Sequence, residues 1–341
     1  ILAELSAELE TVTVEGSRSE DLGISWLQSV EGAAIYEAKK TELIALADVT
    51  ANLATNTSRQ VYARVPGLNI FENDGVGLQL AIGARGLDPN RSSNFNVRQN
   101  GYDISADALG YPESYYTPPV PALQRIEIIR GAAGLQYGPQ FGGLLNFKFK
   151  EGEAEKKIGV TTANTVGSFG LINTFNSVGG TIGKVSYYSF YQYKKSTGWR
   201  PNSELDQHTA FGSIKYNFTP FINLKAEFTH MNYLAQQPGG LTDTQFEQDP
   251  TRSTKSRNWF QVGWNSGAVI FNYRINSNLK LNNRTFFLRA NRYSLGDLDT
   301  AIDLGGERTV IKDDFTNWGN ELRLPYNYDF LGKKSVLLVG G

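Results

Sequence analysis

The second half of the chain repeats one pattern of segments and connections. From about residue 157 on, segments of about 10 residues are joined by connections of two lengths. The connections are short at residues 180–184, 219–221 and 275–278 and long at residues 196–208, 234–258 and 292–314. Short turns at one end of the strands and long loops at the other are typical of an outer-membrane β-barrel, whereas a soluble meander has no reason to sort its connections in this way.

Alternation of apolar and polar residues supports strands in this half. In residues 222–230, Ile222, Leu224, Ala226 and Phe228 occupy one face, and Asn223, Lys225, Glu227 and Thr229 occupy the other. Residues 209–218 repeat the pattern, whereas residues 184–193 alternate poorly. The polar face would meet solvent in a β-sandwich and the lumen in a barrel, and the alternation does not separate these two folds.

Composition excludes several other classes of protein. With 33 basic and 34 acidic residues the net charge is -1, so no global field attracts nucleic acid. The absence of cysteine removes disulfides, thiolate metal sites and cysteine nucleophiles. Apolar runs such as residues 43–47 fall far short of the roughly 20 residues that a spanning helix needs. The abundance of Gly, Tyr, Phe and Trp suits an outer-membrane barrel, and also a soluble β-sandwich or propeller.

The sequence gives little support to an enzyme. His208 and His230 are far apart and have no cysteine near them, so they do not form a metal-ligand cluster. Neither a G-x-S-x-G elbow nor a phosphate-binding P-loop occurs in the chain. We therefore expect a protein that is not an enzyme and has neither a catalytic site nor a metal site of its own.

Six short motifs follow one another between residues 65 and 150. They are Val65-Pro66-Gly67-Leu68-Asn69-Ile70, Ile82-Gly83-Ala84-Arg85-Gly86, Arg98-Gln99-Asn100-Gly101, Arg125-Ile126-Glu127-Ile128-Ile129-Arg130-Gly131, Leu135-Gln136-Tyr137-Gly138 and Gly142-Gly143-Leu144-Leu145-Asn146-Phe147. The glycines suit tight turns, and Asn100-Gly101 is a strong hairpin signal. In this order the motifs resemble the plug domain of TonB-dependent outer-membrane receptors.

The resemblance implies an α+β plug domain inside an antiparallel transmembrane β-barrel. We expect residues 1–20 to be an N-terminal tail, residues 21–150 the plug, and residues 151–341 the first part of the barrel. A receptor of this kind has about 22 strands, and about nine are counted here. The chain is thus expected to stop part-way round the barrel, and the protein is expected in the outer membrane of a Gram-negative bacterium, in contact with its lipid.

The N-terminal tail contains a candidate coupling segment. Glu10-Thr11-Val12-Thr13-Val14 resembles the TonB box, an extended segment that adds to a sheet of TonB. Strand addition needs free main-chain groups and favours β-branched side chains, which this segment has. The resemblance therefore implies TonB of the TonB-ExbB-ExbD complex as a partner. An ordinary strand is the alternative reading of these residues.

Within the family, the chain resembles the ferric citrate receptor branch, most clearly in residues 236–250 and 258–260. Two plug loops, at residues 88–94 and 103–119, are expected to face the outside. The ligand candidates in these loops are Asn90, Arg91, Ser92, Tyr111, Tyr115 and Tyr116, and the barrel loops add Arg252 and Arg257. Arginine suits an anionic chelate because its guanidinium binds carboxylates in a bidentate manner. Solvated loop charges and aromatic packing are the alternatives.

Further residues are candidates for contacts between plug and barrel. Arg85, Glu127 and Arg130 resemble charged positions by which plugs of the family engage the barrel wall, and Glu321 is their expected partner. Local surface pairing is the alternative. The function implied is TonB-dependent import of a ferric chelate, with the iron carried in the ligand and no cofactor in the protein. A same-fold importer of a glycan, peptide or cobalamin, and a soluble β-rich binding protein, remain open.

Overall fold

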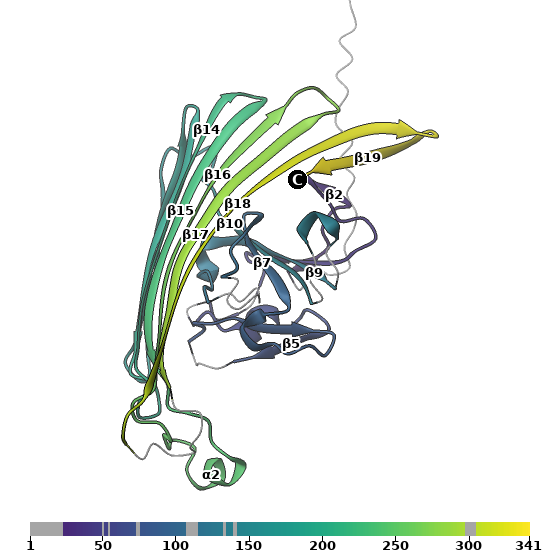
Figure 1. Ribbon diagram of the computed structural model, residues 1–341. Helices are drawn as coiled ribbons and strands as arrows, with labels where there is room; N and C mark the ends of the chain where they lie inside the picture. The colour runs from purple at the N-terminus through teal and green to yellow at the C-terminus, as the bar shows by residue number, and fades with distance from the viewer. Residues whose placement is uncertain are drawn as a thin grey trace, which may run out of the picture.

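The computed structural model describes residues 23–49, 51–53, 55–72, 76–106, 115–131, 134–138, 142–296 and 305–341, with the backbone alone at Arg91 and Leu135. Residues 10–14, expected to meet TonB, and Tyr111 lie outside the described residues. Figure 1 shows a small domain in purple and blue on the concave side of a long curved sheet in teal, green and yellow. Below, the small domain is called the plug and the curved sheet the wall.

The plug is built on a six-stranded sheet with the strand order β1-β4-β9-β10-β7-β8. These strands are β1 (Ile24–Ser25), β4 (Lys40–Ala45), β9 (Leu123–Arg130), β10 (Gly143–Phe149), β7 (Phe95–Gln99) and β8 (Tyr102–Asp103). Neighbours are antiparallel except β7 and β10, which run parallel. Residues 125–130, from the fourth of the six motifs, lie in β9 at the centre of this sheet.

Shorter elements complete the plug. They are the hairpin of β2 (Val30–Glu31) and β3 (Ala34–Ile35), the hairpin of β5 (Leu68–Phe71) and β6 (Ala81–Ala84), α1 (Ser58–Tyr62), and the 3-10 turns η2 (Asn90–Ser92), η3 (Val120–Ala122) and η4 (Leu135–Tyr137). No helix in the described part of the chain is long and apolar enough to cross a bilayer.

The wall has nine strands within the described ranges, each antiparallel to the next in chain order. They are β11 (Gly159–Gly167), β12 (Leu171–Ile182), β13 (Val185–Ser196), β14 (Leu205–Thr219), β15 (Ile222–Gln236), β16 (Trp259–Arg274), β17 (Lys280–Gly296), β18 (Thr309–Phe330) and β19 (Lys333–Gly340). The strand count and the antiparallel order expected from the sequence are confirmed.

Connection lengths follow the expected pattern with one departure. Turns 183–184, 220–221 and 331–332 join strands at one end, and longer loops such as 197–204 and 237–258, which carries α2 (Asp243–Gln248), lie at the other. The connection 168–170 is a short turn at the loop end. Strands are also longer than expected, up to 22 residues in β18. Pairing continues through residues such as Arg292 and Asp313, which the sequence assigned to a loop.

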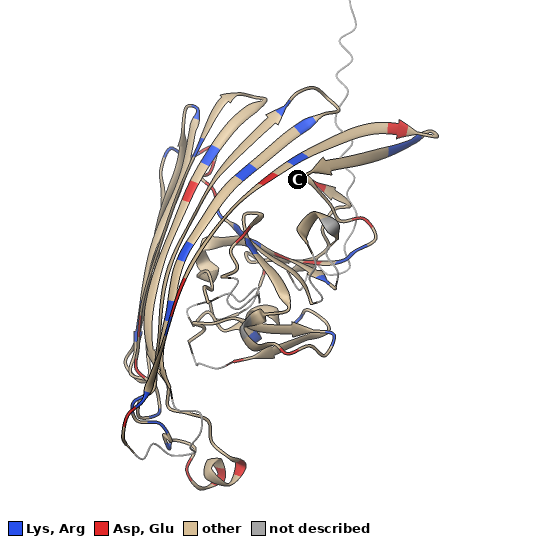
Figure 2. Ribbon diagram, in the orientation of Figure 1, with Lys and Arg blue, Asp and Glu red and all other residues tan. Residues whose placement is uncertain are grey.

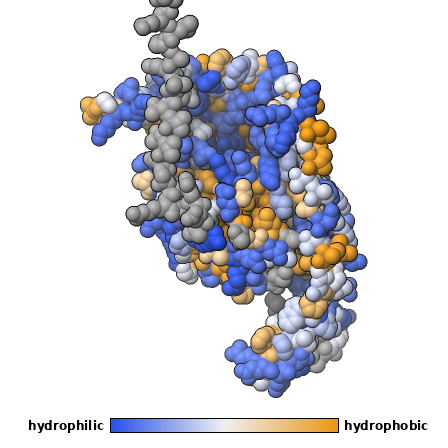
Figure 3. Space-filling view, turned by 180° about the vertical axis from the view of Figure 1, so that it is seen from behind, coloured by the Kyte–Doolittle hydropathy of each residue, from blue (hydrophilic) through white to orange (hydrophobic). Residues whose placement is uncertain are grey.

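The wall buries its polar face, and this distinguishes a barrel from a β-sandwich, the two folds that the alternation of residues did not separate. In β15, Lys225 and Glu227 are 7% and 5% exposed and lie toward the plug, whereas Phe228 on the other face is 47% exposed. Apolar residues accordingly show along the convex edge of the wall in Figure 3, while charged residues are spaced along its strands in Figure 2. An apolar exterior around a polar interior is the pattern of an outer-membrane barrel, because the exterior meets lipid.

A layer of aromatic side chains joins the plug to the wall. Phe149 of the plug stacks on Phe211 with ring centroids 4.6 Å apart and on Phe190 at 6.0 Å. Tyr116 stacks on Trp264 at 6.3 Å. These rings are buried and belong to one apolar cluster that includes residues of both parts. The plug therefore shares a core with the wall, which fixes its seat on the concave face.

Gly143, at the start of β10, provides a test of this packing. Its φ is +141°, and a Cβ there would lie 1.9 Å from the carbonyl oxygen of Ile129. We expect Gly143→Ala to destabilise the protein by more than about 2 kcal/mol, because the strand must move away from β9. Thermal unfolding of the full chain in detergent measures the effect. Gly212→Ala is the control, since no atom lies within 4 Å of its Cβ position, and equal losses in both variants would contradict the prediction.

Candidate functional site

The turn that the sequence predicted at Asn100-Gly101 makes a buried contact between plug and wall. Both residues have positive φ, 48° and 90°, as a tight hairpin turn between β7 and β8 requires. The Asn100 amide donates to both carboxylate oxygens of Glu227 at 2.9 Å. The neighbouring Gln99 amide donates to the Thr229 hydroxyl at 2.9 Å. The buried polar face of β15 is thus paired with plug amides, which offsets the cost of its desolvation.

A charged cluster lies beside this turn, around Glu321 of β18. Arg98 of the plug donates to Glu321 at 2.7 Å, and Arg323 of the wall donates to it at 3.1 Å. Arg323 also donates to the backbone oxygen of Gln136 at 2.9 Å. Arg98 is held in place by a bond of 2.6 Å to Asn96 and by its position over the Tyr137 ring. Glu321 therefore connects the plug to the wall through a buried arginine.

A second group of contacts between plug and wall, around Tyr115 and Arg292, lies nearer the long loops than the Glu321 cluster does. Tyr115 packs against Phe260, and its hydroxyl accepts a hydrogen bond of 2.5 Å from Arg292 of β17. Arg292 also pairs with Asp313 of β18. Tyr116 is fully buried, and burial raises its pKa, so its phenol remains neutral at physiological pH. In the structure, Tyr115 and Tyr116 anchor the plug on the wall, and their role as ligand contacts stays a prediction.

The first predicted apical loop ends where β7 begins. Strand β10 leads toward Glu151, which pairs with Lys215 and Lys225 near the short turns of the wall. Because β7 runs parallel to β10, β7 also ends near the short turns and begins near the long loops. Residues before Phe95 therefore lie at the end of the plug that is near the long loops. Asn90 is exposed, and its backbone N–H donates to Asp88. Ser92 is buried and its hydroxyl joins Leu80 to Ile82. For Arg91, the structure gives a place in η2.

The wall loop between β15 and β16 contains the two other predicted arginines. It projects beyond the plug and carries α2, whose capping box is formed by Thr242 and Gln245. Arg200 donates to the Arg252 backbone oxygen at 2.6 Å, which ties this loop to the preceding one. Arg257 donates to the backbone oxygen of Gly306 at 3.1 Å. The two arginines therefore lie in the long wall loop between β15 and β16, which contacts the neighbouring loops.

Of the residues predicted to join plug and wall, one does so in the structure and the others make contacts within the plug. Glu321 contacts the plug, and its plug partner is Arg98. Glu127 accepts hydrogen bonds from Arg125 and Asn146 within the plug. Arg130 pairs with Glu42 and donates to the Pro66 backbone oxygen, both also in the plug.

Arg85 has a different environment. It has a positive φ of 59° and packs over Gly131, where a Cβ would lie 2.2 Å from its guanidinium. The structure brings Arg85, Arg130 and Glu127 to the plug's own framework, and it brings Glu321 to the interface.

Sequence reasoning did not single out Arg98, Glu227 or Arg292. Arg98 and Asn100 belong to a motif that was read only as a turn, and Glu227 lies on the polar face of the clearest strand. A rule that charged residues on the lumen face of a strand face the plug would have found Glu227. Arg292 gave no such signal because its segment was assigned to a loop.

Comparisons with known proteins agree with this architecture. The family model of the TonB-dependent Receptor Plug Domain matches residues 39–144. The unliganded ferric citrate transporter FecA is similar in structure, with a TM-score of 0.75 at 21% identity over 89% of this chain and 47% of FecA. BauA, the ferric preacinetobactin receptor of Acinetobacter baumannii, gives a TM-score of 0.70 at 13% identity over 89% and 46%. The copper transporter OprC gives 0.66 at 14% identity over 88% and 45%.

The wall and the plug seat define an architecture: a curved antiparallel sheet with an apolar exterior and a small domain docked on its polar concave face. The chain contains a TonB-dependent receptor plug domain at residues 39–144, and its fold is similar to that of FecA and BauA. It spans about half the length of the structures it matches.

Glu321 gives a test of the interface. We expect Glu321→Ala to loosen the plug by about 1 to 3 kcal/mol, because it leaves the buried Arg98 and Arg323 with one charged partner fewer. Hydrogen exchange of β7 amides in the full chain measures the loosening as faster exchange. Asp329→Ala, an exposed carboxylate of the same strand, is the matched control. Unchanged exchange in Glu321→Ala would show that this cluster does not hold the plug.

Proposed function

We propose that this receptor imports a ferric chelate across the outer membrane, with ferric citrate or a related siderophore as ligand. The observation that carries the proposal is the plug seated on the concave face of the wall, with its loop 88–94 at the end where the long wall loops are. Support for an iron ligand comes from FecA and BauA, whose descriptions name ferric citrate and ferric preacinetobactin. The fold also occurs in a copper transporter, so cargo has to be decided by ligand binding.

The ligand site in this proposal is the outer face of the plug. The proposed contacts are Asn90 and Arg91 in η2, Tyr115, and Arg252 and Arg257 of the long wall loop. Tyr111, which lies outside the described residues, is proposed as a further contact. Arginine and amide donors suit the carboxylates of an anionic chelate. Ser92 and Tyr116 are assigned a structural role beside the site. The Ser92 hydroxyl donates a hydrogen bond to the Leu80 backbone oxygen, and the Tyr116 ring is buried against Trp264.

Coupling to energy is assigned to residues 10–14. The chain contains no nucleotide-binding motif, so the energy for import must come from another protein. TonB would supply it by adding this segment to its own sheet and pulling on the plug. The plug meets the wall through polar pairs as well as stacked rings. Hydrogen-bonded polar pairs can exchange with water as they open, so the proposed pull encounters a contact that can be remade.

Arg91→Ala tests the ligand site. We expect affinity for ferric citrate to fall about tenfold, which is about 1.4 kcal/mol, because one charge-assisted contact is lost. Equilibrium binding of radioactive ferric citrate to the purified receptor measures it. Arg59→Ala is the control, since Arg59 is an exposed plug arginine whose side chain pairs with Glu72. An unchanged affinity in Arg91→Ala would remove this residue from the site.

The same assay, run with other ferric chelates, a glycan, a peptide and cobalamin, tests the cargo. Binding of one of the last three, with none to any ferric chelate, would overturn the proposed function and favour the alternative importer.

Deleting residues 10–14 tests the coupling. We expect ligand binding to cells to persist and iron uptake to stop, because the plug can no longer be pulled. Deleting residues 3–7 instead is the control, since it removes five residues and leaves the candidate segment intact. Uptake that continues after deletion of residues 10–14 would exclude them as the coupling segment.

A further inference from the structure

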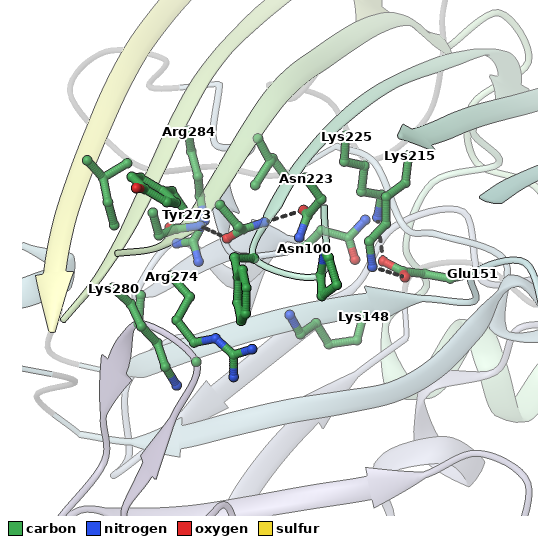
Figure 4. Close-up of a pocket in the computed structure, with 18 residues that line it drawn as sticks. Asn100, Lys148, Glu151, Lys215, Asn223, Lys225, Tyr273, Arg274, Lys280 and Arg284 are labelled. Carbon is green, nitrogen blue, oxygen red and sulfur yellow. Dashed lines mark hydrogen bonds and ion pairs between the residues drawn. The ribbon is translucent and has the colours of Figure 1, made fainter. Parts of the chain in front are cut away.

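A cavity of about 370 Å³ lies between plug and wall at the end where the short turns are. Its wall side is formed by the 220–221 turn and by the adjoining ends of β14 to β17, and its plug side by Lys148, Asn100 and the β2–β3 hairpin (Figure 4). Strands β14 to β17 are each paired with a neighbour on both sides. The cavity therefore faces the middle of the wall and does not border its last strand, β19. The volume is within the range of small-molecule sites, about 300 to 1,000 Å³.

Positive charge dominates the lining. The basic residues are Lys148, Lys215, Lys225, Arg274, Lys280 and Arg284, and the acidic one is Glu151. Glu151 pairs with Lys225 at 3.1 Å and with Lys215 at 3.4 Å, so its charge is already used. Figure 4 shows Lys148 and Arg274 on two sides of the cavity, with Lys280 beside Arg274. Among the described residues, no carboxylate forms an ion pair with these three side chains.

The remaining polar groups are also incompletely matched. Arg284 donates to the Gly101 backbone oxygen at 3.2 Å and lies 3.7 Å from Glu321, but its buried Nε has no hydrogen-bond partner in the described structure. Burial lowers the pKa of Lys148, and the nearby charges of Arg284, Arg125 and Lys225 lower it further, whereas Glu127 raises it. Positive groups that repel one another around a cavity are stabilised by an anion placed between them.

We propose that this cavity binds a small anion with two or more carboxylates, held between Lys148 of the plug and Arg274, Lys280 and Arg284 of the wall. Cations on two sides of the cavity suit a ligand with separated charges, and the planar guanidinium groups match carboxylate geometry. The site lies at the opposite end of the plug from loop 88–94. It does not depend on the identity of the imported ligand, and both a free periplasmic carboxylate and a chelate in transit have this chemistry.

Lysine footprinting on the full receptor in detergent tests the site. A soluble acetylating reagent is applied with metal-free citrate, with ferric citrate, with phosphate or with chloride at equal ionic strength, and mass spectrometry gives the rate at each lysine. At a citrate concentration near ten times Kd, we expect Lys148 and Lys280 to react about tenfold more slowly than in chloride. Lys184, exposed at a short turn of the wall, is the internal control and is expected to react at an unchanged rate.

Arg274→Gln is expected to weaken this protection severalfold, while Lys333→Gln, which removes one positive charge from another short turn, is expected to leave it intact. Protection by metal-free citrate identifies a free carboxylate as sufficient, and protection by ferric citrate alone identifies the chelate as the source. Equal protection by phosphate would overturn the assignment to carboxylates, and none by any anion would overturn the site. The footprint involves no uptake, so its failure leaves the proposed import function standing, and loss of chelate import leaves the footprint standing.

Discussion

The buried polar face of the wall is the constraint on which the rest of the structure depends. Lys225, Glu227 and Thr229 lie on the concave side of β15, where they are buried. Burying such groups without partners costs several kcal/mol, so the wall needs a polar surface against it. The plug supplies one through Gln99, Asn100 and their neighbours. The position of the plug follows from the satisfaction of these groups as much as from its apolar packing.

Stacked rings and hydrogen bonds contribute differently to the interface between plug and wall. Stacked rings such as Phe149 on Phe211 stabilise the interface mainly by burying apolar area, which depends less on exact geometry than a hydrogen bond does. Hydrogen bonds such as those of Arg98 to Glu321 and Asn100 to Glu227 fix the plug in one orientation, because each depends on geometry. A small shift of the plug would therefore break the hydrogen bonds before it separated the rings. The polar pairs specify the orientation in which the plug is seated.

Residue pattern alone predicted the strands, their antiparallel order and the two lengths of connection, because these depend on local alternation and turn chemistry. It did not predict which face of β15 is buried, since alternation is the same for a sandwich and a barrel. The pairing of Glu321 with Arg98 joins residues 223 positions apart, and the sequence offers no register for such a contact. Ser92 illustrates another limit: its hydroxyl is taken up by the backbone of a neighbouring segment, which no single sequence reveals.

The stacked rings lie directly beside buried hydrogen bonds between plug and wall: Phe211, which stacks on Phe149, is paired with Thr229 across the β14–β15 ladder. Closely packed rings leave few gaps as large as a water molecule. The contact between plug and wall is therefore dry at Phe149 and Phe211, and the hydrogen bond of Gln99 to Thr229 is shielded from competing water, which strengthens it.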